Sequence, residues 1–599
     1  MQHLSTRLLL LVVLILPSFC QNSLPDSRLD PTVTIAVLAR NAHANLPWFL
    51  GAIEQLSYPK NRISIWISTD HNEDETAELL TAWTEAVREL YHHVNLTIGL
   101  EGRYGDESGH DLGYWSEDRY DHMIAMRQEG LDMARRSWSD YLLMVDTDQF
   151  IYNKNMLSDL IDLNKPIVAP MMNSTSLYTN FWGAVSQDGF YKRSDDYIDI
   201  LDRNKMGTFE VPMVHSIFLV DLRYRRSRHL KYHPPPPNYH SAADDIIQFA
   251  FSARNNDVPM YITNTRYYGY LIPPVDQGPQ FLQLVADYGL FIRLHHIHSD
   301  MLLKPSEFLP RPPPKYSNKL NFDEVYMINL ERRPDRRTMM ELALAELGIE
   351  YKYFPAVDGR QLNSSYLDEL GVKQLDGYLD PYHKRPMKMG EIGCFLSHYF
   401  IWKEMEEKGY ERILIFEDDV RFRINFIRFF YEMMAEADSH IGGWDLLYIG
   451  RKIMQNDEDF VSNAQHLVYP GYTYWTLSYA LTRRGMTKFL AQDPISRMIP
   501  VDEYLPILFG AHTNKEWLHK YSPRNVLALS ANPLFVEPLK YIGEDGYVSD
   551  TEDSVPITEA KQEASSIEGD TTSEKSRDTE FSNSDSVGNR HPLPRHGEL

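Results

Sequence analysis

Residues 141–148 read YLLMVDTD and residues 413–419 read ILIFEDD. In both stretches a short apolar run, typical of a buried β-strand, ends abruptly in acidic side chains. The carboxyl ends of parallel strands form the edge at which open α/β folds bind ligands. Each stretch therefore predicts a buried strand that carries acids to the ligand-binding edge of a sheet.

The acids in these stretches predict a divalent metal. Asp146 and Asp148 are two residues apart in an extended chain, so their side chains face the same side. Neighbouring carboxylates repel, and one pKa rises unless a cation neutralises them. Mg²⁺ and Mn²⁺ prefer oxygen ligands and can also bind a diphosphate, offsetting the charge of a departing nucleotide. We expect such a site at Asp146 and Asp148, and equally at Glu417, Asp418 and Asp419.

Asp-x-Asp spacing alone is weak evidence, and the chain contains its own control. Asp457-Glu458-Asp459 has the same spacing in a polar stretch with no strand before it, which predicts a solvated loop. For Asp146 and Asp148 the alternatives are helix capping and a surface turn.

Around these stretches the pattern predicts an α/β protein with two blocks, each a mainly parallel, doubly wound sheet, because strands alternate with helices. In the first block we expect strands at 33–38, 63–67 and 141–145, and helices at 47–56, 75–91 and 122–137. In the second we expect strands at 325–330, 413–416, 446–449 and 474–481, and helices at 336–347 and from 485.

Five prolines between 302 and 320 predict a semi-rigid spacer. The expected boundaries are a signal peptide at 1–20, domains at 30–301 and 322–548, a linker at 302–321 and an acidic, disordered tail at 549–599.

Both ends of the chain suggest the lumen of the endoplasmic reticulum. The apolar run at 8–16, followed by small residues, is typical of a secretory signal peptide. The last four residues, His596, Gly597, Glu598 and Leu599, resemble a retrieval signal, with Gly597 in place of the usual Asp. After cleavage only Cys394 would remain, so the mature chain could form no internal disulfide. Three tripeptides are N-glycosylation acceptors, at Asn95, Asn173 and Asn363.

The composition narrows the partners. The formal net charge of −24 over 599 residues argues against nucleic acid and anionic membranes. No later stretch is long and apolar enough to span a membrane. The oligomeric state stays open, with a homodimer as one option.

Other polar residues are candidates for the remaining chemistry. An inverting sugar transferase needs a base for the acceptor hydroxyl, and Asp244, Asp245 and Asp502 precede apolar helical runs. The alternative is that these acids only stabilise helix N-termini, with Ser241 as a cap. Three more expectations concern binding: Asp70 could contact a nucleoside, His215 could complete a metal shell, and Arg332 and Arg336 could hold phosphate or pair with surface acids.

Many short motifs together resemble glycosyltransferase family 25, and within it the procollagen galactosyltransferases. In the second block they are MINLERRPDR at 327–336, AVDG at 356–359, GEIGCFLSH at 390–398, IFEDDV at 415–420, DLLYIG at 445–450 and VDE at 501–503. In the first block they are TDHN at 69–72, VDTD at 145–148 and DDII at 244–247, and GEDGYVSD at 543–550 extends the match.

The resemblance implies two tandem nucleotide-sugar transferase domains, GT-A-like and of Rossmann type, joined by the proline-rich linker. It implies manganese, UDP-galactose as donor, and hydroxylysine of procollagen chains, before triple-helix formation, as acceptor. A β-linked product from an α-linked donor implies inversion. The family pattern would place metal or donor contacts at both acid clusters and the base among Asp244, Asp245 and Asp502. The sequence slightly favours the first block as the active one. An endoplasmic reticulum retrieval receptor is a further expected partner.

Two other functions compete with this one. A catalytically inactive relative could act in adhesion or bind collagen, and the acids retained at both strand ends argue against it. A transferase for another acceptor, such as a lipid-linked glycan, is disfavoured by the retrieval-like ending and the collagen-related motifs.

Overall fold

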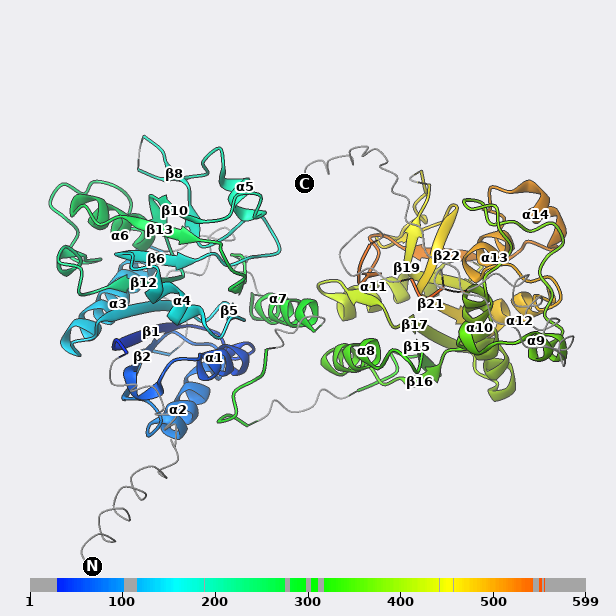
Figure 1. Ribbon diagram of the computed structural model, residues 1–599, viewed down its shortest axis with the longest axis horizontal. Coiled ribbons are helices and arrows are strands. Elements are labelled where there is room, and N and C mark those ends of the chain that lie inside the picture. The colour runs from blue at the N-terminus through cyan, green and yellow to red at the C-terminus, as the bar shows by residue number, and fades with distance from the viewer. Residues whose placement is uncertain are drawn as a thin grey trace, which may run out of the picture.

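The fold is that of a computed structural model, which describes residues 30–101, 116–187, 189–274, 281–297, 303–310, 317–440, 442–455, 457–541, 549–551 and 554. The expected signal peptide, most of the tail and the retrieval-like ending lie outside these residues. Figure 1 shows two α/β units, each built on its own sheet, with one helix between them.

The first unit has an eight-stranded sheet at its centre. Its strands, in spatial order, are β10 (Thr208–Val211), β13 (Met260–Thr263), β6 (Ile167–Pro170), β12 (Ile217–Asp221), β4 (Tyr141–Asp146), β1 (Val33–Ala39), β2 (Ile63–Thr69) and β3 (His93–Ile98). Most neighbours are parallel, as expected, but β12 runs antiparallel to both β4 and β6, and β10 antiparallel to β13. The small pairs are β5 (Gln149–Ile151) with β14 (Gly269–Leu271), β7 (Phe181–Trp182) with β11 (Met213–Val214), and β8 (Ala184–Val185) with β9 (Tyr191–Lys192).

Helices cover both faces of this sheet because successive side chains of a strand point to opposite faces. One face packs against α1 (Leu46–Gln55), α2 (Thr76–Val87) and α4 (Met156–Asp162). The other packs against α3 (Glu117–Arg136), α5 (Tyr197–Leu201) and α6 (Asp245–Asn255). Short 3₁₀ turns lie at Lys60–Arg62 and Ser227–His229. The apolar run of β4 is buried from both sides, which is why its sequence carries no alternation.

The second unit repeats this plan with a seven-stranded sheet. Its order is β16 (Lys352–Pro355), β15 (Glu324–Asn329), β17 (Arg412–Glu417), β21 (Thr473–Thr482), β19 (Leu446–Ile453), β22 (Ala528–Ala531) and β20 (Leu467–Val468). Here β21 runs antiparallel to β17 and β19. A separate pair joins β18 (Val420–Phe422) to β23 (Val536–Pro538). Each unit therefore has a reversed strand beside the strand that ends in acids.

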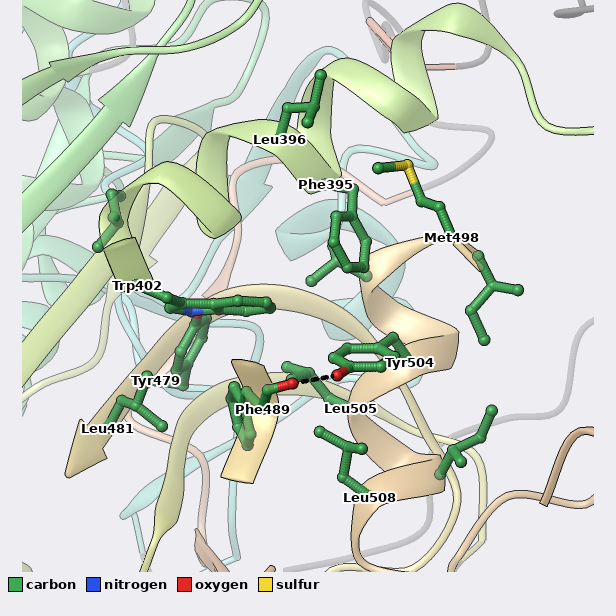
Figure 2. Packing of buried hydrophobic residues seen from close by; sticks show 14 of the residues in the cluster. Phe395, Leu396, Trp402, Tyr479, Leu481, Phe489, Met498, Tyr504, Leu505 and Leu508 are labelled. Atoms are coloured by element: carbon green, nitrogen blue, oxygen red, sulfur yellow. Dashed lines mark hydrogen bonds between the residues drawn. The ribbon is translucent and has the colours of Figure 1, made fainter. Parts of the chain in front are cut away.

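One face of the second sheet packs against α8 (Pro334–Leu347) and α11 (Phe426–Ser439). The other packs against α9 (Ser364–Leu370), α10 (Met389–Lys408), α12 (Arg483–Leu490), α13 (Val501–Leu508) and α14 (Lys515–Lys520), with a 3₁₀ turn at Gly359–Gln361. Figure 2 shows this core, where Trp402 and Phe395 of α10 meet Tyr504 of α13. The Tyr504 hydroxyl donates to the Phe489 carbonyl oxygen at 2.7 Å. This core fixes the first turn of α13, where Asp502 lies.

Helix α7 (Phe281–His296) lies between the two units (Figure 1). Its Ile292 packs with Phe150 of the first unit, and its Leu294 belongs to the core of the second. The Arg293 guanidinium lies 3.8 Å from the centre of the Trp48 ring in α1 and 3.5 Å from Glu346 in α8. Part of the expected spacer also packs down, since the Glu307 amide donates to the Glu54 carboxylate at 3.0 Å.

Some expected elements differ from the observed ones. Helix α3 begins at Glu117, five residues earlier than expected, because the Ser116 side chain accepts from the Arg119 amide and caps it. Helix α2 ends at Val87 rather than continuing to residue 91, and edge strand β3 follows. Helix α6 is capped by Asp244, not by the expected Ser241.

Candidate functional site

Each acid cluster lies at the end of a central strand, and an antiparallel strand runs beside that end. In the first unit β12 begins opposite the end of β4, and the Asp146 amide donates to the Ser216 carbonyl at 2.9 Å. In the second, Phe416 of β17 pairs with Ser478 of β21. The reversed strands therefore bring side chains that are distant in sequence, His215 and Thr476, to the acids.

In the first unit a buried arginine binds the acids. Arg127 of α3 donates through both terminal nitrogens to the two oxygens of Asp146, each at 2.9 Å. Its Nε donates to Asp245 at 2.6 Å. Burial raises the pKa of Asp146, although Arg127 opposes that effect. Asp146 and Asp245 thus meet at one guanidinium, and both oxygens of Asp146 are already occupied.

Asp148 and His215 are the other two side chains of this unit that the sequence predicts as metal ligands. Burial and the neighbouring Asp146 raise the pKa of Asp148 to about 7. Gln149 donates to one oxygen of Asp148 at 2.6 Å. Burial lowers the pKa of His215 to about 4, so the ring is neutral at neutral pH. Its Nε2 is buried and has no hydrogen-bond partner among the described residues, so this nitrogen suits a metal.

Asp244 lies at the start of α6, where its carboxylate accepts from the Ile247 amide at 2.9 Å. Burial and the charge of Asp245 raise the pKa of Asp244 to about 6. Capping of a helix therefore accounts for Asp244, and pairing with Arg127 accounts for Asp245, without requiring a role as base for either.

Asp70 lies at the end of β2, separated from β4 by β1. It contacts two histidines, His71 at 3.0 Å and His122 of α3. The nearby Asn72 side chain accepts from the Asn41 amide at 3.0 Å and joins the loops after β1 and β2. Asp70 is therefore at the same sheet edge as Asp146 but in a separate group of side chains.

In the second unit the three consecutive acids diverge to different partners. Glu417 accepts from the Thr476 hydroxyl and lies 3.4 Å from Nε2 of the buried His398. Asp418 accepts from Asn329 at 2.6 Å. Burial would raise the pKa of Glu417, but the hydrogen bond and charge of His398 outweigh it and lower that pKa.

Asp419 is the least satisfied acid of this cluster. Its Oδ2 accepts from Arg336 at 3.2 Å, and the same Arg336 nitrogen donates to Asp418 at 3.2 Å. Its Oδ1 is buried and accepts no hydrogen bond from any residue that the structure describes. Burial, Glu417 and Asp418 raise the pKa of Asp419 to about 7. Asp418 and Asp419 share one arginine, and with the neighbouring Glu417 they offer the carboxylate oxygens that hard divalent metals favour.

Asp502 and the arginines complete this region. Asp502 lies in the first turn of α13, and burial and the charge of Glu503 raise its pKa well above the usual range. The charges of Glu391 and Glu417 add to this rise in the pKa of Asp502. Glu503 itself pairs with His512 at 2.6 Å. Arg332 donates to Asp358 at 2.9 Å and to Asp550 at 2.6 Å.

The glycosylation acceptors lie at different kinds of position. Asn95 is on edge strand β3, Asn173 follows β6, and Asn363 caps α9 by accepting from the Tyr366 amide at 2.8 Å.

Among the described residues no helix combines the length and apolar character needed to cross a membrane.

Sequence reasoning missed Arg127, His398 and Asp550. Arg127 and His398 lie inside helical patterns where they read as ordinary polar positions. A signal for each existed, because both interrupt an otherwise buried helix face, and a buried charge or imidazole needs a partner. Asp550 ends the motif at 543–550 that resembles the family, but its place beside the acidic tail gave no sign of its arginine partners.

Each of the two doubly wound α/β units carries acids at the end of a central strand, at the edge where open α/β folds bind ligands. The description "Glycosyltransferase family 25, N-terminal domain" matches residues 30–288, and "Glycosyltransferase family 25 (LPS biosynthesis protein)" matches residues 322–505. The chain belongs to glycosyltransferase family 25 and is an enzyme of that family.

Several curated relatives match over most of their length. Procollagen galactosyltransferase 2 of Mus musculus is 45% identical, covering 88% of this chain and 84% of the mouse protein. Procollagen galactosyltransferase 1 of Danio rerio is 44% identical, covering 88% of each chain. A glycosyltransferase 25 family member of Aedes aegypti is 43% identical, covering 88% of this chain and 87% of the insect protein.

Proposed function

We propose that this chain transfers galactose from UDP-galactose to hydroxylysine side chains of procollagen, forming a β-linked galactosyl-hydroxylysine with inversion. The names of the relatives, together with matches that span both units, support a galactosyltransferase acting on collagen. The donor, the hydroxylysine acceptor and the mechanism are our extension from the chemistry of the acids.

We place the reaction in the second unit, although the sequence alone slightly favoured the first. The single observation that carries this choice is the difference between the two arginines. Arg127 occupies both oxygens of Asp146 at 2.9 Å, whereas Arg336 makes a single 3.2 Å bond to Asp419. Within the described residues Asp419 Oδ1 has no hydrogen-bond partner. A buried carboxylate oxygen with no donor is the more available metal ligand.

Glu417, Asp418 and Asp419 would hold the metal, with Mn²⁺ as the expected ion. When bound, the metal would neutralise these acids and stabilise the negative charge of the leaving diphosphate. Arg336, with Arg332 beside it, would bind phosphate oxygens through paired N–H groups. His398 orients Glu417 by pairing with it, and the Asn329 amide does the same for Asp418.

Asp502 is our candidate for the base that accepts the proton of the acceptor hydroxyl. Its raised pKa makes its carboxylate a stronger base than an exposed aspartate. The Glu503–His512 pair holds the neighbouring position of α13 and restricts how Asp502 can turn. Asp245 is a weaker candidate because Arg127 already binds it.

The first unit is a second candidate for catalysis, favoured by one observation. His215 Nε2 is buried and has no hydrogen-bond partner in the part of the chain that the structure describes, so it could complete a cation site with Asp148 and Asp146. In that case Asp70 would contact the nucleoside and Asp244 or Asp245 would act as base.

The test measures UDP release from several UDP-sugars with a hydroxylysine-containing collagen peptide, in the wild type, Asp419→Asn and Asp148→Asn. We expect activity with UDP-galactose, loss in Asp419→Asn, and retention in Asp148→Asn. Loss only in Asp148→Asn would move the reaction to the first unit. Chelation should stop turnover and Mn²⁺ should restore it, so turnover that persists in chelator would contradict the mechanism.

We further propose residence in the endoplasmic reticulum lumen, with the ending His596–Leu599 bound by a retrieval receptor and glycans on Asn95, Asn173 and Asn363. Deleting the last four residues should move the protein into the medium of cultured cells. Equal retention of the shortened chain would contradict the retrieval role. Size measurement on the purified chain would show whether it forms a homodimer.

A further inference from the structure

The segment after the second unit returns to the arginines that begin α8. Asp550 accepts from Arg332 at 2.6 Å and from Arg333 at 2.7 Å, each through a different carboxylate oxygen. Arg336 lies 3.7 Å from the same carboxylate. The Asp550 side chain is only 11% exposed. Three guanidinium groups therefore surround one buried carboxylate, in the arrangement by which arginines bind a phosphate.

A second contact fixes this segment to the start of α10. The Ser554 hydroxyl accepts from the Gly390 amide at 2.9 Å and donates to the Thr551 carbonyl at 2.8 Å. The approach leaves no room for a side chain at position 390, where an added Cβ would lie 2.7 Å from the Thr551 oxygen. We call the described residues 549–551 and 554 the strap. The strap therefore packs closely on the second unit.

Charge balance makes the strap a competitor of an anionic ligand. Besides Asp550, the three arginines contact the carboxylates of Asp335, Asp358, Asp418 and Asp419. The acids in this group outnumber the arginines. A divalent cation would reduce that excess, but a diphosphate arriving with the cation would repel Asp550 and compete with it for the same guanidinium groups.

We propose that the strap is a self-inhibitory element in which Asp550 occupies the phosphate-binding arginines, and that the diphosphate of a nucleotide sugar displaces it. This inference rests on the proposed donor site in the second unit. Binding of the donor must then overcome the strap, so the apparent donor affinity is lower than that of the open site. Release of Asp550 would also free the start of α10, since Ser554 and Asp550 belong to the same short segment.

The first experiment compares steady-state transfer by the full chain, its Asp550→Asn variant and the matched control Asp457→Asn, whose acid is exposed. We expect KM for UDP-galactose to fall roughly three- to tenfold in Asp550→Asn, with KM for the collagen peptide unchanged and Asp457→Asn equal to wild type. An unchanged or higher KM for the donor would overturn the proposal, because a purely structural strap would hold the arginines in place for the donor.

The second experiment uses the wild-type chain and needs no strap variant to fold. Hydrogen exchange of a peptide spanning 549–554 should become faster when UDP and Mn²⁺ are added together. Slower or unaltered exchange would refute displacement. In Asp419→Asn the same addition should leave exchange unchanged. If exchange rises in Asp419→Asn as it does in the wild type, the metal assignment fails while the strap stands. If exchange does not rise in the wild type although Asp419→Asn has lost transfer activity, the strap alone fails.

Discussion

At the scale of single residues, the two acid clusters differ in how they are neutralised. Arg127 donates two hydrogen bonds to Asp146, and its guanidinium is buried away from solvent. Asp419 shares Arg336 with Asp418, and no described residue donates a hydrogen bond to its other oxygen. Similar acids in similar strands can therefore serve different purposes, and only the partner side chains reveal which.

Asp419→Asn tests the second cluster directly. The substitution keeps the size of the side chain but removes the charge that would bind the cation, so transfer should fall at least about a hundredfold. The folded structure should persist, because relief of like-charge repulsion offsets the lost contact with Arg336. Activity and thermal unfolding are measured together, and near-normal transfer in a folded variant would exclude Asp419 from the metal site.

Asp244 predicts a pH dependence of stability. Its pKa is raised to about 6 in the folded chain, mainly by burial, so the fold favours the protonated form. The stability from this protonation is complete below pH 4 and is lost as pH rises through about 6. Asn can still accept from the Ile247 amide but does not ionise. As the pH rises from 4.5 to 7.5, the free energy of unfolding of Asp244→Asn should therefore increase by about 1 kcal/mol or more relative to that of the wild type.

The measurement is the midpoint of urea unfolding for both proteins across that pH range. A difference between the two proteins that stays constant with pH would contradict the raised pKa of Asp244.

At the scale of elements, the reversed strands decide which side chains meet. Strand β12 runs against β4 and begins beside its end, which brings His215 to the acids. Strand β21 runs against β17 and brings Thr476 to Glu417 in the same way. Helix α3 then closes the first site, since Arg127 links it to β4 and to the start of α6.

Arg127→Met should therefore destabilise the first unit strongly. It removes the guanidinium that binds both Asp146 and Asp245 and leaves two largely buried carboxyls without that cation, a change that costs about 3–5 kcal/mol in comparable cases. Arg136→Met on the same helix is the control, because Arg136 and its partner Glu129 are both exposed. Chemical unfolding followed by tryptophan fluorescence should separate the two variants, and equal losses would show that the Arg127 network contributes little.

At the scale of the whole molecule, α7 joins the two units. It packs on Phe150 and Trp48 of the first and contributes Leu294 to the core of the second. Arg293 contacts both units at once through the Trp48 ring and Glu346. Contacts of this kind make the unfolding of one unit depend on the other.

Arg293→Ala should weaken that dependence. Scanning calorimetry of the wild-type chain should show one main transition, and the variant should show two separated transitions because each unit then unfolds more independently. Arg266→Ala, which removes the pair between the exposed Arg266 and Asp159 within the first unit, should leave the wild-type profile. A single unchanged transition in Arg293→Ala would show that α7 holds the units together without this residue.

The sequence by itself determined the two α/β units, the strands that end in acids and the family, because buried strands produce long apolar runs and the motifs of the family are local. It also predicted α1 and α8 closely, since their apolar positions recur with helical spacing. These features depend on residues that are near one another in the chain.

Only the tertiary structure decided which residues surround the acids. Arg127 reaches Asp146 across 19 positions and Asp245 across 118, and Asp550 reaches Arg332 across 218. The reversed direction of β12 and β21 is likewise invisible in local patterns, because a buried strand has the same composition in either direction. The neutralisation of each acid depends on such long-range contacts, which arise only when the strands and helices pack together.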